Sequence, residues 1–97
     1  MIHPMELART RREEILSLAS KYGAYNVRVF GSVARGEAGP ESDLDLLVAF
    51  ESGRSLLDLV GFEQDLAELL GQKVDVVVEG GISPYMEKQI LSEAVPL

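Results

Sequence analysis

Three aspartates within apolar, strand-like runs constrain this 97-residue chain more than any other feature. Asp43 and Asp45 stand one residue apart at the start of the run 43–50, and Asp75 interrupts a run of valines. An unpaired charge is costly to bury, so carboxylates in such runs need a partner. On a strand, the side chains of Asp43 and Asp45 leave the same face, with about 6.5 to 7 Å between their backbone positions.

This spacing is typical of a site for divalent metal ions. Two carboxylates placed in this way can converge on metal ions held about 3.5 to 4 Å apart. Mg²⁺ suits them, because it is a hard cation that binds a few carboxylates together with substrate phosphates and water. Asp75 completes the cluster if its strand lies beside the strand of Asp45. Without metal, three such carboxylates repel one another and resist ionisation.

A Gly-Ser pair ahead of the aspartates predicts the complementary, phosphate-binding half of the site. Gly31 lets the backbone approach a phosphate closely, and free N–H groups at a helix start bind anions. The Ser32 hydroxyl adds another donor. Arg35, one turn later, has two interpretations of equal weight, contact with a phosphate oxygen or an ion pair with Glu37. The sequence therefore predicts a metal site that faces a nucleoside triphosphate.

A structural explanation of the aspartates competes with the catalytic one. In that interpretation Asp43 belongs to a turn or a helix cap, and Asp45 and Asp75 are charges that protect edge strands from aggregation. The single histidine, His3, stands near the N-terminus, where a catalytic role is not expected. The tyrosines are expected to pack in the fold and not to bind an adenine ring.

Periodicity and breaker residues predict the order of the elements. Helices are expected over 5–22, up to Leu70 from an N-cap at Ser55, and from Ser83-Pro84 onward. Strands are expected over 27–30, 43–50 and 73–79, with a short helix over 32–35 and a loop over 37–42. The residues expected to pack these helices are Leu59, Phe62, Leu66, Leu69, Tyr85, Ile90 and Leu91.

This order predicts an α/β (α+β) fold, in which helices cover a small β-sheet on at least one side. The largely apolar strand 43–50 suggests cover on both faces, and the helix after it permits a parallel crossover. The length predicts one domain over residues 1–97, with no room for a separate substrate domain. We therefore expect the other half of an active site to come from a partner or a second copy.

Composition excludes several classes of function. The formal net charge of −7 argues against nucleic-acid binding, which relies on clustered Lys and Arg. The chain has no cysteine, which excludes disulfides and thiolate zinc sites. Neither an apolar signal core nor a membrane-spanning run is found, so the expected location is cytoplasmic and no membrane partner is expected.

Two motifs and Asp75 together resemble the DNA polymerase β-like nucleotidyltransferases. The chain's short length, and the Ala-Arg-Gly-Glu that follows Gly-Ser, resemble the minimal nucleotidyltransferase (MNT) branch of that superfamily. The residues that carry the resemblance are Gly31-Ser32-Val33-Ala34-Arg35-Gly36-Glu37, Ser42-Asp43-Leu44-Asp45-Leu46-Leu47-Val48, and Asp75.

The resemblance implies a mixed sheet flanked by helices and a definite reaction. A nucleoside triphosphate, usually ATP, donates its NMP group to a hydroxyl and releases pyrophosphate. Asp43 and Asp45 would hold two Mg²⁺ ions, and Asp75 would bind the catalytic one and favour the attacking alkoxide. Gly31 and Ser32 would bind the triphosphate.

The resemblance also implies a partner. MNT proteins are often encoded beside a HEPN-domain protein, in pairs similar to toxin–antitoxin modules. In such pairs the MNT protein silences a HEPN ribonuclease by transferring AMP to its tyrosine. We therefore predict an antitoxin that adenylylates a HEPN toxin. The alternatives are a non-catalytic antitoxin that occludes its partner, and an enzyme that adenylylates a small molecule such as an aminoglycoside. Either a homo-oligomer or a hetero-oligomer is compatible with the sequence.

Overall fold

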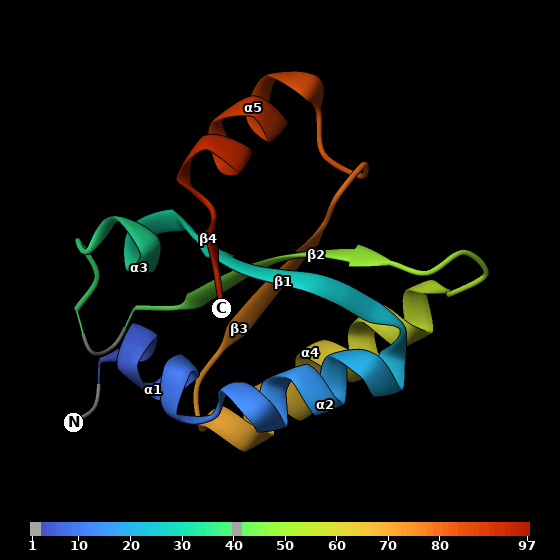
Figure 1. Ribbon diagram of the computed structural model, residues 1–97, viewed down its shortest axis with the longest axis horizontal. Helices are drawn as coiled ribbons and strands as arrows, with labels where there is room; N and C mark the ends of the chain where they lie inside the picture. Colours follow the sequence, from blue (N-terminus) through green and yellow to red (C-terminus); the bar gives the residue numbers. More distant parts are fainter. Residues whose placement is uncertain (1–2, 40–41) are drawn as a thin grey trace.

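A four-stranded mixed β-sheet forms the middle layer of the fold (Figure 1). The computed structural model describes residues 3–39 and 42–97, so Pro40 and Glu41 of the predicted loop lie outside the described residues. The described elements are α1 (Pro4–Thr10), α2 (Arg12–Tyr22), β1 (Ala24–Phe30), α3 (Gly31–Arg35), β2 (Leu44–Phe50), α4 (Leu56–Leu70), β3 (Val74–Val78), α5 (Pro84–Glu93) and β4 (Val95–Pro96). The predicted α/β fold with a small sheet and covering helices is confirmed.

The strand order is β3-β2-β1-β4. β1 pairs antiparallel with both β2 and β4, whereas β2 and β3 are parallel. Because α4 connects β2 to β3, the parallel crossover that the sequence permits is present. β4 was not predicted, because two residues, one of them a proline, are too short for any strand pattern.

The prediction of one helix over 5–22 is wrong in one respect, because this segment forms two helices, α1 and α2. The chain turns at Arg11, which has φ −100° and ψ 19°, although no glycine or proline stands there. α1 packs against α3, while α2 packs against β1 and α4. Tertiary packing therefore bends a sequence whose local pattern is continuous. His3 caps α1, since its Nδ1 accepts a hydrogen bond from the Met5 N–H at 3.2 Å.

The first strand starts at Ala24, three residues before its predicted start. A β-bulge shifts the register between Tyr25 and Arg28, and Asn26 has a positive φ of 52°. A bulge breaks the alternation of side chains by which a strand is recognised in a sequence. This explains why the pattern misses the beginning of β1.

The hydrophobic core lies between the sheet and the layer of α1, α2 and α4 (Figure 1). In α4, Phe62 and Leu66 are fully buried, and Leu59 and Leu69 pack at the margin of the core. Ser55 caps this helix, as the sequence predicts, and the structure shows that it does so in a reciprocal capping box with Asp58. The sheet contributes the buried residues Val27, Val29, Leu44, Leu46, Val48, Val74 and Val76.

The opposite face of the sheet carries α3 and α5 (Figure 1). Leu47 points to this face and is fully buried, which confirms the predicted cover on both faces. In α5, Ile90 is buried as predicted, but Tyr85 is 89% exposed and Leu91 41% exposed. The prediction that Tyr85 and Leu91 dock this helix is wrong, because α5 contacts the rest of the fold along a narrow strip. No helix within residues 3–39 and 42–97 combines the length and apolarity needed to cross a bilayer.

Glu63 protects the free edge of β3, which sequence reasoning did not find. Its Oε2 accepts a hydrogen bond at 2.9 Å from the backbone N–H of Val76, on an edge strand rich in valine. We expect Glu63→Ala to lower the free energy of unfolding by about 1–2 kcal/mol and to promote association through the exposed edge. Thermal melts and sedimentation velocity test this, with Glu68→Ala on the same helix as the control. A monomeric Glu63→Ala protein with unchanged stability contradicts it.

Candidate active site

The structure brings the three predicted aspartates to one end of the sheet, on the face that carries α3 and α5. Asp43 directly precedes β2, Asp45 lies in β2 and Asp75 lies in β3. Asp45 and Asp75 are register partners in the parallel β2–β3 ladder, so their strands are about 4.8 Å apart at this point. The sequence predicts that Asp75 joins the cluster only if its strand lies beside the strand of Asp45. The two strands are neighbours, so this condition is met.

The position of β2 bears on the structural explanation of these residues. β2 lies between β1 and β3, so Asp45 is on an interior strand. A charge on an interior strand cannot protect a sheet edge from another chain. Only Asp75 is on an edge strand, because β3 is the outermost strand on its side. Edge protection therefore does not explain Asp45.

Burial and repulsion both act on Asp45. Burial raises the pKa of its carboxyl above the usual value, and the negative charges of Asp75 and Asp43 raise it further. The positive charges of Lys73 and Arg35 act in the opposite direction. Asp45 is therefore held near other negative charges at a cost to the folded state, which a bound cation would relieve.

Lys73 is a member of the cluster that sequence reasoning missed. Its Nζ lies 3.7 Å from Oδ2 of Asp43 and 3.9 Å from Oδ1 of Asp75. The signal was present, since Lys73 stands two residues before Asp75 and its side chain therefore leaves the same face. Lys73 therefore places a positive charge near two of the three carboxylates.

The three carboxylates are of the right chemical type to bind a divalent metal ion, but their oxygens do not converge on one point. Among residues 3–39 and 42–97, no three His, Cys, Asp or Glu side chains converge closely enough to hold a metal ion. Carboxylate oxygens are nevertheless the ligands that Mg²⁺ prefers, and within residues 3–39 and 42–97 the ion-pair partner of both Asp43 and Asp75 is the exposed Lys73. Movement of Lys73 and rotation of the carboxylates would be needed to form the site.

Gly31 lies directly against Asp45. It has a positive φ of 75°, and a Cβ atom at this position would overlap Oδ2 of Asp45. Phe30, the residue before it, is the register partner of Asp45 across β1 and β2. Gly31 and Ser32 form the first turn of α3, and no side chain caps this helix start. The predicted phosphate-binding turn and the aspartates are thus neighbours in space.

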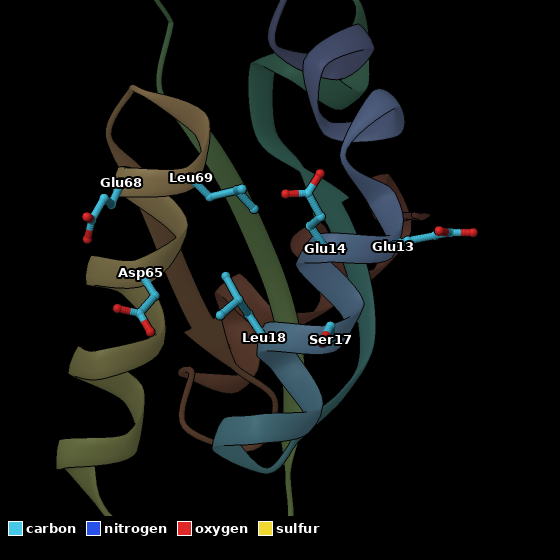
Figure 2. A pocket seen from close by; sticks show the side chains of 7 residues that line it. All are labelled: Glu13, Glu14, Ser17, Leu18, Asp65, Glu68 and Leu69. Carbon is cyan, nitrogen blue, oxygen red and sulfur yellow. The ribbon is translucent and has the colours of Figure 1, made fainter.

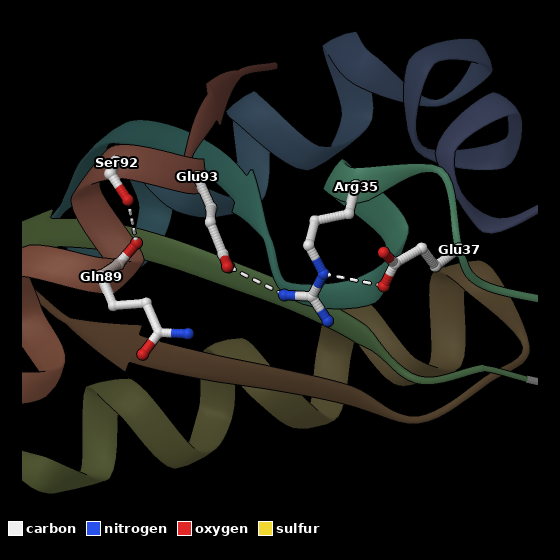
Figure 3. A network of polar contacts seen from close by, with 5 residues as sticks. All are labelled: Arg35, Glu37, Gln89, Ser92 and Glu93. Carbon is white, nitrogen blue, oxygen red and sulfur yellow. Dashed lines mark hydrogen bonds and ion pairs between the residues drawn. The ribbon is translucent and has the colours of Figure 1, made fainter.

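Arg35 forms a polar network with residues from two other segments (Figure 3). Its Nε donates a hydrogen bond to Glu37 at 3.0 Å, and its Nη1 donates to Glu93 of α5 at 2.9 Å. The hydrogen bond to Glu37 raises the pKa of the Arg35 guanidinium, so the group is charged. Beside this pair, the Ser92 hydroxyl donates to the carbonyl of Gln89. The ion pair with Glu37 is present as one interpretation predicts, Glu93 was missed, and a phosphate contact stays a prediction.

Comparison with known proteins identifies the family to which this chain belongs. The family model of the nucleotidyltransferase domain matches residues 11–97. A Methanocaldococcus jannaschii protein assigned as a protein adenylyltransferase is 43% identical over 84 residues, which are 87% of this chain and 90% of that protein. The protein adenylyltransferase MntA of Thermococcus cleftensis is 41% identical over 78 residues, which are 80% of this chain and 79% of that protein.

Solved structures share the fold. A structure described as a minimal nucleotidyltransferase is 58% identical, with a TM-score of 0.85 over 95% of this chain and 94% of that chain. The complex of a tri-AMPylated Shewanella oneidensis HEPN toxin with an MNT antitoxin contains a similar chain, with a TM-score of 0.69. That match covers 91% of this chain and 69% of the other at 19% identity, and it shows likeness of fold alone. The chain belongs to the nucleotidyltransferase domain family and is an enzyme of the transferase class.

Proposed function

We propose that this protein is a Mg²⁺-dependent nucleotidyltransferase that transfers AMP from ATP to a tyrosine hydroxyl of a HEPN-domain partner, and so acts as an antitoxin. One observation carries the proposal. Asp45 and Asp75 are register partners on neighbouring parallel strands, and the glycine of the Gly-Ser turn lies against Asp45. A carboxylate cluster beside a phosphate-binding turn is the arrangement that nucleotidyl transfer requires.

In this proposal, Asp43, Asp45 and Asp75 hold two Mg²⁺ ions. Bound there, the ions would neutralise charge on the triphosphate and stabilise the charge that develops during transfer. Gly31 and Ser32 bind the triphosphate through backbone N–H groups and a hydroxyl. The acceptor oxygen bonds to the α-phosphorus, and the bond from that phosphorus to the bridging oxygen breaks. Pyrophosphate leaves, and the hydroxyl proton passes to Asp75.

Arg35 is proposed as an additional contact for the triphosphate. It already binds two carboxylates with a planar, charged guanidinium, which suits phosphate oxygens equally well. To reach a phosphate it must exchange Glu37 or Glu93 for the ligand. Its electrostatic effect on Asp45 indicates that it lies near enough to act on the cluster.

The acceptor is the part of the proposal that rests on relatives. Curated relatives are named protein adenylyltransferases, and a chain of similar fold occurs in a complex with an AMPylated HEPN toxin. The described residues contain no separate module that would bind a small substrate. A partner protein that presents its own tyrosine supplies the acceptor without such a module.

Intact-mass spectrometry of a HEPN-domain partner tests the proposal. We expect the partner to gain the mass of AMP when it is incubated with this protein, ATP and Mg²⁺, and to gain nothing when EDTA replaces Mg²⁺. Replacement of the acceptor tyrosine by phenylalanine is expected to abolish the gain. Neutralisation of the toxin without any mass gain would instead indicate occlusion, and AMP found on an aminoglycoside would indicate a small-molecule substrate.

A further inference from the structure

A groove between α2 and α4 lies on the outer side of the helical layer (Figure 2). Its volume is about 530 Å³, within the range of pockets that hold a ligand or several side chains. Leu18 from α2 and Leu69 from α4 reach into the gap between the two helices. Both leucines pack only at the margin of the core, so each keeps apolar surface that faces the groove.

Carboxylates surround this apolar floor. Glu13 and Glu14 come from α2, and Asp65 and Glu68 come from α4. The nearest cations within the described residues engage two of them, since Arg11 pairs with Glu14 at 2.9 Å and Lys21 lies 3.8 Å from Asp65.

The two outer carboxylates, Glu13 and Glu68, differ from Glu14 and Asp65 in their ion pairing. Glu13 and Glu68 have no ion-pair partner among residues 3–39 and 42–97. Figure 2 shows that their side chains point away on opposite sides of the groove. Among the described residues, those that line the groove include no basic side chain. The surface therefore combines an apolar centre with an acidic rim, in which Glu13 and Glu68 have no ion-pair partner among the described residues.

We propose that this groove binds a basic amphipathic helix of a partner protein. An apolar ridge on such a helix would bury the exposed surface of Leu18 and Leu69, while its flanking Lys or Arg side chains would pair with Glu13 and Glu68. Charge complementarity selects this occupant. A second copy of a chain with net charge −7, a nucleic acid or an anionic membrane would each meet repulsion at the acidic rim.

The groove is separated from the catalytic cluster by the sheet. α2 and α4 cover one face of the sheet, whereas Asp45 points to the face that carries α3 and α5. A partner held in the groove is therefore bound independently of the reacting atoms. The inference does not depend on nucleotidyl transfer, so it can be correct even if the proposed reaction is not.

Titration with a synthetic amphipathic helix, with leucines on one face flanked by lysines, tests the groove. We expect saturable binding to the wild-type protein, and binding that weakens with salt because the pairs are exposed. The double variant Glu13→Lys, Glu68→Lys should bind at least about tenfold more weakly. The control Glu6→Lys, Glu51→Lys changes the net charge equally at exposed sites outside the groove and should bind as the wild type does. Ser17→Trp, which fills the groove without removing a core residue, should also lose binding.

Several outcomes would overturn the inference. They are the absence of saturable binding, equal binding of the same helix with glutamates in place of lysines, and equal loss in the control variant. Self-association of the wild type that Ser17→Trp abolishes would make a second copy the occupant. Asp45→Asn should still bind the helix fully, and loss of binding in that variant would contradict the independence of the groove from the catalytic face.

Discussion

Asp45→Asn is expected to abolish AMP transfer, with a fall of at least about a thousandfold in the rate, while the folded protein becomes more stable at pH 7. Catalysis is lost because an amide is a poor ligand for Mg²⁺ and cannot replace the central carboxylate of the cluster. Stability rises because burial and the negative charges of Asp75 and Asp43 raise the pKa of Asp45 and so oppose its ionisation, whereas asparagine carries no charge. We expect the melting temperature to increase by a few degrees.

The pH dependence of this effect has a definite sign. The pKa of Asp45 is raised in the folded state, so the folded protein binds the Asp45 proton more tightly than the unfolded chain does. The wild type is therefore relatively most stable below the unfolded-state pKa, where the carboxyl is protonated in both states. It loses this stability as the pH rises through the folded-state pKa. The difference in melting temperature between Asp45→Asn and wild type should therefore be largest at pH 7. It should shrink toward zero as pH falls below about 4.

Thermal melts from about pH 3 to about pH 7, together with the AMP-transfer assay, test both halves of this prediction. Glu6→Gln serves as the control, because it removes a carboxylate that is exposed and distant from the cluster. Mg²⁺ should raise the melting temperature of the wild type and leave that of Asp45→Asn nearly unchanged. Full partner modification by the double variant Asp43→Asn, Asp45→Asn would show that the metal assignment is wrong.

Gly31→Ala is expected to lower AMP transfer by about a hundredfold or more, because it displaces a carboxylate of the proposed metal site. The new Cβ would overlap Oδ2 of Asp45, so the carboxylate must move. The positive φ of 75° adds a backbone cost of about 1–2 kcal/mol for any L side chain. The variant therefore loses both activity and stability.

Gly36→Ala is a matched control for this variant. Gly36 stands at the other end of α3 with a φ of 74°, nearly the value of Gly31, and a Cβ there would meet nothing within 4 Å. Both variants should lose the stability that the positive φ costs, as measured by denaturant or thermal unfolding, but only Gly31→Ala should lose activity. Equal activity of the two variants would contradict the close approach of Gly31 to Asp45.

Local signals were sufficient for much of the fold. Helices begin at Ser55 and at Ser83-Pro84 and end at Gly71, where the sequence predicts, because capping depends on residues within a few positions of one another. Features that depend on distant contacts were missed. The bend at Arg11 arises from packing of α1 on α3, and the bulge at Asn26 hides the start of β1.

In the candidate site, too, residues close together in the sequence were predicted and residues paired across long sequence distances were missed. Gly31, Asp43 and Asp45 are close in sequence, and their motif predicted their role without the fold. Lys73 and Glu93 were not found, because an ion pair between segments far apart in the chain leaves no local pattern. Arg35 shows the limit most clearly, since its nearby partner Glu37 was predicted and its distant partner Glu93 was not.

The sequence by itself determined which residues carry the proposed chemistry, because carboxylates in apolar strands and a Gly-Ser turn have few other uses. Only the tertiary structure decided that Asp45 and Asp75 are adjacent, since strand order and register depend on how the whole sheet pairs. It also decided that the acidic groove faces away from the cluster of aspartates, because side chains that alternate along a strand separate the two faces of the sheet.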